Sequence, residues 1–157
     1  VMPSGPLREN LKSLISAHIV LINGGKDEEF EKKILKINNN LEIFYSFYVP
    51  LNIDEFKNKN LIAIASIGNP NNFFKLLEDH NLSIDKKLIY LDHYKFSEKQ
   101  IKDILLDAEK NNYHIIMTEK DFAKFKNYKS NRLNYLKVSL KLENPEKFIK
   151  KVKEVYV

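Results

Sequence analysis

Apolar residues in this chain alternate between two spacings. Short apolar runs predict buried strands, and apolar residues three or four positions apart predict amphipathic helices. The predicted strands are residues 18–22, 41–49, 61–67, 88–91, 113–117 and 133–142. The predicted helices are residues 7–17, 27–37, 70–80 and 97–110, a short helix after 118 and a last helix that begins at 145. This alternation predicts an α/β fold in three layers with a mostly parallel sheet.

The same pattern predicts a domain boundary near residues 41–51. Residues 1–42 contain a helix, a strand and a helix, which cannot form a core alone, so we expect the first helix to pack poorly in this chain. Residues 43–50 are expected to form a hinge strand. Residues 51–157 are expected to form an α/β domain that ends with a second hinge strand and a helix.

Composition narrows the class of protein. Hydrophobic residues make up 43% of the 157 residues and charged residues 30%, as in ordinary globular proteins. The net charge of +5 favours anionic partners such as nucleotide phosphates, nucleic acid or an anionic membrane face. The lysines, however, are interspersed with acids, which is typical of a solvated surface. The absence of cysteine excludes disulfides, cysteine-ligated zinc and a thiol nucleophile.

Several catalytic and nucleotide-binding motifs are absent. The sequence has no G-x-x-x-x-G-K-[ST] phosphate loop, no G-x-G-x-x-G, no G-x-S-x-G and no H-E-x-x-H. Only four glycines are present, so neither glycine-rich loop is concealed. No apolar run reaches the roughly 20 residues of a membrane span, and the first residues lack the apolar stretch of a signal peptide.

The first residues have the chemistry of a loop that leads into a helix. Pro3, Ser4 and Gly5 favour a turn, and Pro6 suits the first helical position. Arg8 and Glu9 then lie at a predicted helix N-terminus, where anions tend to bind.

Three predicted strands of the second domain end in polar residues, which a parallel sheet would collect at one edge. Gly68-Asn69-Pro70 follows the first of these strands, and this sequence is also a common strand-to-helix turn. The segment Thr118-Glu119-Lys120-Asp121 follows the third, and it also fits a helix cap.

Asp92-His93 follows the second of these strands and is the most suggestive pair. Histidine titrates near neutral pH and a neighbouring acid can orient it, so the pair suits a general base. Adjacent residues often point to opposite sides, however, which leaves Asp92 free to serve a different partner. The other histidines have structural interpretations: His18 starts a predicted strand, His80 ends a helix and His114 lies in a strand.

In their order along the chain these segments resemble the tetraacyldisaccharide 4′-kinase (lipid A 4′-kinase) family of Gram-negative bacteria. The matching residues are Pro3-Ser4-Gly5-Pro6-Leu7-Arg8-Glu9, Ile67-Gly68-Asn69-Pro70 with Phe73-Phe74, Asp92-His93 and Thr118-Glu119-Lys120-Asp121. The resemblance implies transfer of the ATP γ-phosphoryl group to the 4′-hydroxyl of a tetraacyl glucosamine disaccharide 1-phosphate, a lipid A precursor. It also implies Mg²⁺ and a peripheral location at the cytoplasmic face of the inner membrane.

The resemblance implies that residues 1–42 are the last helix–strand–helix of a P-loop kinase domain, a remnant that is followed by a small α/β domain. The N-terminal half of the kinase, which this chain does not contain, would supply most of the ATP and Mg²⁺ ligands. We therefore expect no metal ligand here and no ATP turnover by the isolated chain.

By the same resemblance His93 matches the catalytic histidine, which forms a base dyad with an aspartate of the N-terminal half. Arg8 and Glu9 match the polar pair near the nucleotide. Asp92, Asn69 and the segment from Thr118 to Asp121 are then candidates for substrate contact or structural support. Against the family pattern, His18 replaces an Asp, Ser66 a Gly, Asn72 an Arg, and Tyr94 a second His.

An alternative from a different class is also open. The chain would then be a non-catalytic α/β module that binds an anionic lipid or nucleic acid. The kinase interpretation expects no nucleic acid partner. A phosphate-loop motif upstream of Val1 in the reading frame would favour the kinase.

Overall fold

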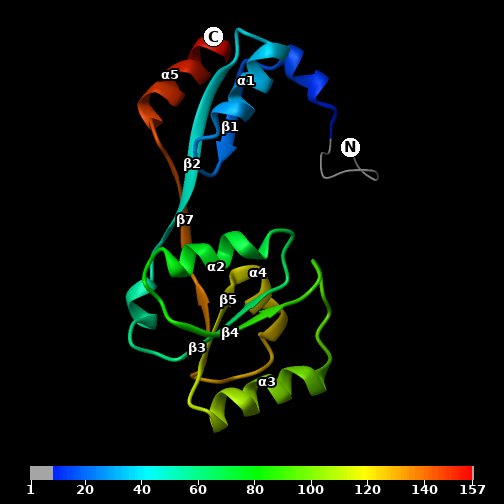
Figure 1. The fold of residues 1–157 in the computed structure, drawn as a ribbon, viewed down its shortest axis with the longest axis vertical. Coiled ribbons are helices and arrows are strands. Elements are labelled where there is room, and N and C mark those ends of the chain that lie inside the picture. Colours follow the sequence, from blue (N-terminus) through cyan, green and yellow to red (C-terminus); the bar gives the residue numbers. More distant parts are fainter. Residues whose placement is uncertain (1–8, 157) are drawn as a thin grey trace. The chain divides into compact units, whose positions relative to one another are not determined.

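The computed structural model describes residues 9–156 of the chain, and these form two compact units (Figure 1). The first unit comprises the described residues up to 49 together with those from 140 onward, and the second comprises Pro50–Ser139. The last helix, expected within the domain of residues 51–157, groups with the first unit in the structure.

The first unit is built on a three-stranded sheet. The sheet consists of β1 (Ile19–Asn23), β2 (Glu42–Pro50) and β7 (Val138–Leu142), in the order β1-β2-β7, and β1 and β2 are parallel. The last residue of β2 and the first two of β7 belong to the second unit. Its α-helices are α1 (Glu28–Ile37), which the side chain of Asp27 caps, and α5 (Pro145–Tyr156).

Two contacts explain why α5 belongs to the first unit. The ring of Phe148 packs edge-on against Phe44 of β2, with ring centres 5.2 Å apart. The Lys151 ammonium lies 3.1 Å from a carboxylate oxygen of Glu42, at the start of the same strand.

The first predicted helix differs from expectation. In place of a helix over residues 7–17, the structure has a 3-10 helix over Leu11–Ser16, and residues 7 and 8 lie outside the described range. The side chain of Asn10 caps it through the Lys12 N–H, and Ala17 N–H closes it on the Leu14 carbonyl. None of its residues is fully buried, and Ile15 is 65% exposed, so little apolar burial supports a full α-helix here.

The second unit is a three-layer α/β domain. Its strands are β3 (Leu61–Ala65), β4 (Ile84–Ile89), β5 (His114–Thr118) and β6 (Leu133–Leu136), in the order β4-β3-β5-β6. All neighbouring pairs are parallel. Its helices are η2 (Ile53–Phe56), α2 (Pro70–Glu78), α3 (Glu98–Lys110), α4 (Glu119–Phe122) and η3 (Ala123–Phe125). The predicted α/β fold with a parallel sheet is confirmed.

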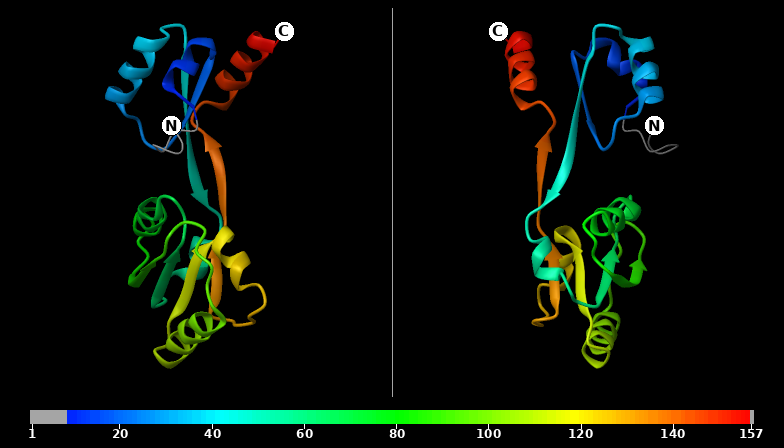
Figure 2. Two further views of the ribbon diagram at one scale, coloured as in Figure 1. Left: turned by 90° about the vertical axis from the view of Figure 1, so that its right-hand side faces the viewer. Right: turned by 60° about the vertical axis from the view of Figure 1, so that its left-hand side comes forward.

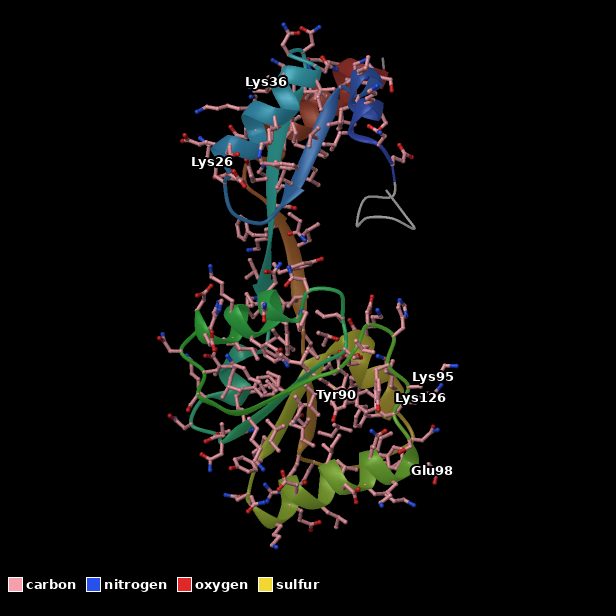
Figure 3. All side chains as sticks on the ribbon, turned by 45° about the vertical axis from the view of Figure 1, so that its right-hand side comes forward. Lys26, Lys36, Tyr90, Lys95, Glu98 and Lys126 are labelled. Atoms are coloured by element: carbon pink, nitrogen blue, oxygen red, sulfur yellow. The ribbon has the colours of Figure 1, made fainter. Side chains whose placement is uncertain are left out.

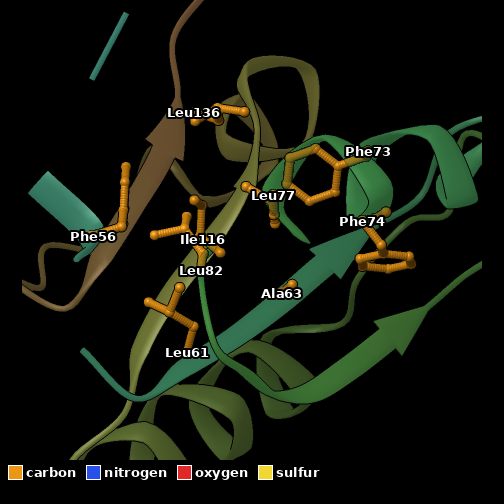
Figure 4. Packing of buried hydrophobic residues seen from close by; sticks show 10 residues of the cluster. Phe56, Leu61, Ala63, Phe73, Phe74, Leu77, Leu82, Ile116 and Leu136 are labelled. Carbon is orange, nitrogen blue, oxygen red and sulfur yellow. The ribbon is translucent and has the colours of Figure 1, made fainter. Parts of the chain in front are cut away.

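Two apolar cores cover the two faces of this sheet. Leu61, Ala63 and Ala65 of β3 face α2, where Phe73, Phe74 and Leu77 are buried against them (Figure 4). Ile62 and Ile64 face the other way, against buried residues of α3. Figures 1 and 2 show α2 and α3 on opposite sides of the sheet. Because β3 is buried on both faces, it has the continuous apolar run of a central parallel strand.

Two predicted strands have different limits in the structure. The strand predicted at 88–91 corresponds to β4, which begins earlier, at Ile84. The added residues include Asp85 and Lys86, whose charged side chains have partners at the edge of the sheet. The Asp85 carboxylate accepts the Leu61 N–H at 2.9 Å, and Lys86 binds Asp107 of α3 at 2.7 Å.

The strand predicted at 133–142 is divided between two sheets. Lys137 separates β6 from β7 because its N–H donates to the side chain of Asn52 and its carbonyl accepts from Leu51.

Candidate active site

The carboxyl ends of β3, β4 and β5 lie at one edge of the four-stranded sheet, as the polar strand ends predicted. Side-chain contacts join the three segments that follow these strands. The Lys120 ammonium, after β5, lies 3.0 Å from Asp92 Oδ1, after β4. Asp121 accepts the backbone N–H of Ser66, after β3, at 2.9 Å.

His93 occupies an unusual backbone position. The N–H of Tyr94 donates to the Leu91 carbonyl at 3.0 Å, which closes a tight turn with Asp92 and His93 at its centre. His93 has φ = 60°, in the left-handed region that costs L-residues about 1 kcal/mol or more. Three other non-glycine residues in the described part have positive φ, and all are asparagines: Asn58, Asn81 and Asn112. A strained histidine in a strand-end loop is typical of a functional position.

Asp92 stabilises this turn. Its Oδ1 accepts the His93 backbone N–H at 2.9 Å as well as the Lys120 ammonium. The hydrogen bond from Lys120 and the nearby imidazole of His93 hold the pKa of Asp92 below its ordinary value. Asp92 is therefore ionised at neutral pH and bridges the two segments.

The imidazole of His93 is available to a substrate. The side chain is 79% exposed, and its Nε2 lies 3.8 Å from Asp92 Oδ2. The turn thus presents an imidazole ring to solvent with a carboxylate beside it, an arrangement suited to accepting a proton.

Asp121 is the most enclosed charged group near this loop. Its side chain is fully buried and accepts hydrogen bonds from Lys124 at 2.7 Å, from Thr118 at 3.0 Å, and from both the N–H and the hydroxyl of Ser66. Burial alone raises the pKa of Asp121, but these hydrogen bonds outweigh it and hold the pKa below the ordinary value. Asp121 is thus a paired, ionised carboxylate at the point where β3 and β5 adjoin.

Sequence reasoning did not place Lys124 or Ser66 in this cluster. The Lys124 ammonium also donates to the Ser66 hydroxyl and lies 5.8 Å from the ring centre of Phe96. The three-residue spacing from Asp121 to Lys124 is the sequence signal that points to this pair. By contrast, the exposed side chains of Lys95 and Lys126 extend outward from the unit (Figure 3).

An aromatic cluster supports the loop that follows His93. The Tyr94 ring packs against Tyr90 with centres 4.8 Å apart, and its hydroxyl accepts from Gln100 at 2.8 Å. Phe96 packs on Tyr90, Tyr94 and the buried Phe125. These contacts fix the end of the loop on α3 and leave the turn at Asp92 and His93 exposed.

The remaining candidates have local structural roles or lie elsewhere. The side chain of Asn69 caps α2, and that of Thr118 caps α4, as their patterns predicted. Glu119 is exposed at the start of α4. Glu9 is exposed in the first unit, and Arg8 lies outside the described residues.

One open cavity lies away from this edge. An open cavity of about 690 Å³ lies at the other edge of the sheet, among residues that precede β3 and β4. Within residues 9–156, no three His, Asp or Glu side chains are grouped to hold a metal ion. No helix in that range is long and apolar enough to cross a bilayer.

Comparison with known proteins decides the family. Residues 1–156 match the family model described as tetraacyldisaccharide-1-P 4′-kinase. The chain belongs to this family. The resemblance seen in the sequence motifs is therefore confirmed.

Individual relatives agree with this membership. The chain is 39% identical over 154 residues to the tetraacyldisaccharide 4′-kinase of Pelagibacter ubique, covering 96% of this chain and 49% of that protein. It is 34% identical over 158 residues to the enzyme of that name from Rickettsia typhi, covering 97% of this chain and 46% of that protein. The chain thus spans about half the length of the curated relatives it matches.

A solved structure has a similar fold. A crystal structure of LpxK from Aquifex aeolicus in complex with ATP aligns with a TM-score of 0.59 at 22% identity, covering 100% of this chain and 48% of that one. At this identity the likeness supports the α/β fold.

Proposed function

We propose that this chain is the C-terminal part of a kinase that phosphorylates the 4′-hydroxyl of a tetraacyldisaccharide 1-phosphate. Family membership and the names of its relatives support the reaction class. The observation that carries the proposal is the exposed imidazole of His93, held in a left-handed turn beside the ionised Asp92. No contact or surface in the described residues favours a nucleic-acid or lipid-binding module in place of a kinase.

In the proposed reaction, the 4′-oxygen of the sugar attacks the γ-phosphorus of ATP. The bond between the γ-phosphorus and the β–γ bridging oxygen breaks, ADP leaves, and the hydroxyl proton passes to the neutral imidazole of His93. Phosphoryl transfer depends mainly on positioning and electrostatics, with a base to orient the nucleophile. His93 would supply that base, together with an aspartate outside this chain.

In this proposal, residues outside this chain make most of the contacts with ATP and Mg²⁺. Arg8 and Glu9 would contribute from the segment before Asn10, Arg8 by pairing its guanidinium with phosphate oxygens. Because the 157 residues contain no phosphate-loop motif, the purified chain alone should not turn over ATP. The complete kinase would act as a peripheral protein at the cytoplasmic face of the inner membrane, where its lipid substrate lies.

The test is a histidine substitution in the complete kinase. His93→Ala removes the base, and His93→Asn removes it while keeping a residue that tolerates positive φ. Each should lower kcat by about 10²–10⁴-fold, the usual scale for a general base. His80→Gln, two residues after the end of α2, is the control and should leave kcat unchanged. Near-normal kcat in both His93 variants would remove this histidine from the mechanism.

A further inference from the structure

Within the described residues, a hydrogen-bonded ion pair between Lys120 and Asp92 links the segment after β5 to the Asp92–His93 turn. Its ammonium shares Asp92 Oδ1 with the backbone N–H of His93, at 3.0 and 2.9 Å. Both groups are partly exposed, with 45% of the Lys120 and 43% of the Asp92 side chain accessible. The pair therefore bridges two loops at the surface and is not a core ion pair.

The other end of this link is rigid. Lys120 precedes Asp121, whose buried carboxylate is bonded to Ser66, Thr118 and Lys124. The Asp121 N–H in turn donates to the Thr118 hydroxyl at 3.2 Å. Helix α4 is thus held at the ends of β3 and β5, and the backbone of Lys120 is held in place with it.

We propose that Lys120 is a positioning residue for His93: it holds Asp92, and through Asp92 the left-handed turn that presents the imidazole. Asp121 anchors the helix from which Lys120 acts. This inference rests on the proposed function, because it assigns to Lys120 an effect on catalysis that passes through His93.

The turn needs such an anchor because its backbone is strained. A histidine at φ = 60° favours other conformations unless surrounding contacts hold it. The shared carboxylate oxygen provides two of these contacts. Without Lys120, the Asp92 side chain could rotate toward water, and the His93 imidazole would sample several orientations. A displacement of about 1 Å at a reacting group can cost about 10²-fold in rate.

The inference differs from a direct role in substrate binding. A lysine that bound a substrate phosphate would mainly affect KM. A lysine that positions the base affects kcat, and only while the base is present. Lys120→Met removes the charge at similar length, Lys120→Arg keeps it, and Lys126→Met is the control at an exposed lysine of the same segment.

In the complete kinase, Lys120→Met should lower kcat by about 10-fold or more with KM changed less than about 2-fold. Lys120→Arg should recover most of kcat, and Lys126→Met should match the wild type. In the His93→Asn background, Lys120→Met should lower kcat no further. A rise in KM at unchanged kcat, or an equal loss of kcat in both backgrounds, would overturn the positioning role.

Amide hydrogen exchange in the same complete protein separates this inference from the proposed function. Lys120→Met should reduce protection of the His93 amide at least several-fold, and Lys126→Met should not. Unchanged protection in Lys120→Met would refute the positioning role even if His93 is the base. If His93→Asn retains normal kcat while protection still falls, the proposed base fails and the kcat effect assigned to Lys120 fails with it.

Discussion

Asp121 accepts a hydrogen bond at 2.9 Å from the backbone N–H of Ser66, which lies 55 positions earlier in the chain. This bond joins the segments that follow β3 and β5, two adjacent strands of the parallel sheet. In parallel sheets of this kind, ligands usually bind in a crevice at the carboxyl ends of two adjacent strands whose following connections run in opposite directions. Here a buried carboxylate, its lysine and a serine fill that point and fix the neighbouring loops.

The first prediction concerns the charge of Asp121. Asp121→Asn leaves the Lys124 ammonium, 23% exposed, without its anionic partner. Breaking a buried ion pair in this way costs about 3–5 kcal/mol. Urea unfolding followed by circular dichroism should show this loss, whereas Glu119→Gln, two residues earlier and exposed, should change stability by less than about 0.5 kcal/mol. A loss below about 1 kcal/mol for Asp121→Asn would mean that the ion pair is dispensable.

The second prediction concerns coupling between Asp121 and Lys124. Lys124→Met removes the ammonium, which also lies 5.8 Å from the ring centre of Phe96, and keeps an unbranched side chain of similar length. Removing both charges leaves no unpaired ion, so the double variant Asp121→Asn with Lys124→Met should be less destabilised than the sum of the single losses. For residues in contact the difference is about 0.5–3 kcal/mol. Additive losses in a double-mutant cycle would contradict a direct interaction.

The third prediction is the pH dependence that follows from the lowered pKa of Asp121. The unfolded carboxyl binds its proton near pH 3.9, the reference value, whereas the folded one binds it only at lower pH. The stabilisation is therefore fully present above the unfolded pKa and is lost as pH falls through the folded pKa. The difference in melting temperature between wild type and Asp121→Asn, measured from pH 7 down to pH 3, should shrink as the pH falls below the unfolded pKa. A constant difference in melting temperature across this pH range would exclude Asp121 as the source of the pH-dependent stabilisation.

The residues at the strand ends show which parts of this site could be predicted from the sequence. Asn69, Asp92, His93 and Asp121 all follow apolar runs, and parallel pairing alone brings such positions to one edge. The contact of Lys120 with Asp92 could not be predicted, because it depends on the rotamers of two surface side chains.

The departures from the predicted elements have similar causes. The start of β4 was missed because Asp85 and Lys86 are charged, and their partners on β3 and α3 are distant in sequence. The division between β6 and β7 depends on Asn52, which is 85 residues from Lys137. Long-range hydrogen bonds of this kind leave no local pattern.

The fourth prediction tests the backbone of His93 apart from its chemistry. At φ = 60°, Asn and Gly are tolerated well, whereas a β-branched residue is strained. The free energies of unfolding of His93→Asn and His93→Gly should therefore lie within about 1 kcal/mol of the wild-type value. For His93→Gly, the relief of strain in the folded state and the added freedom of the unfolded chain are similar in size. His93→Val should be destabilised by about 1–3 kcal/mol. Equal stabilities of the Val and Asn variants in urea would show that the turn does not hold positive φ.

The fifth prediction concerns His114 at the start of β5. Its Nδ1 is buried and has no hydrogen-bond partner in the structure as described. Burial, together with the positive charges of Lys59 and Arg132, lowers the pKa of His114. The unfolded imidazole takes up a proton near pH 6.5, but the folded one resists it, so stability falls as pH drops below 6.5 toward the folded pKa. The free energy of unfolding should decline between pH 7 and pH 5, and His114→Gln should reduce that decline, whereas His18→Gln at an exposed position should not. An identical pH slope in His114→Gln and wild type would contradict a lowered pKa of the partly buried His114.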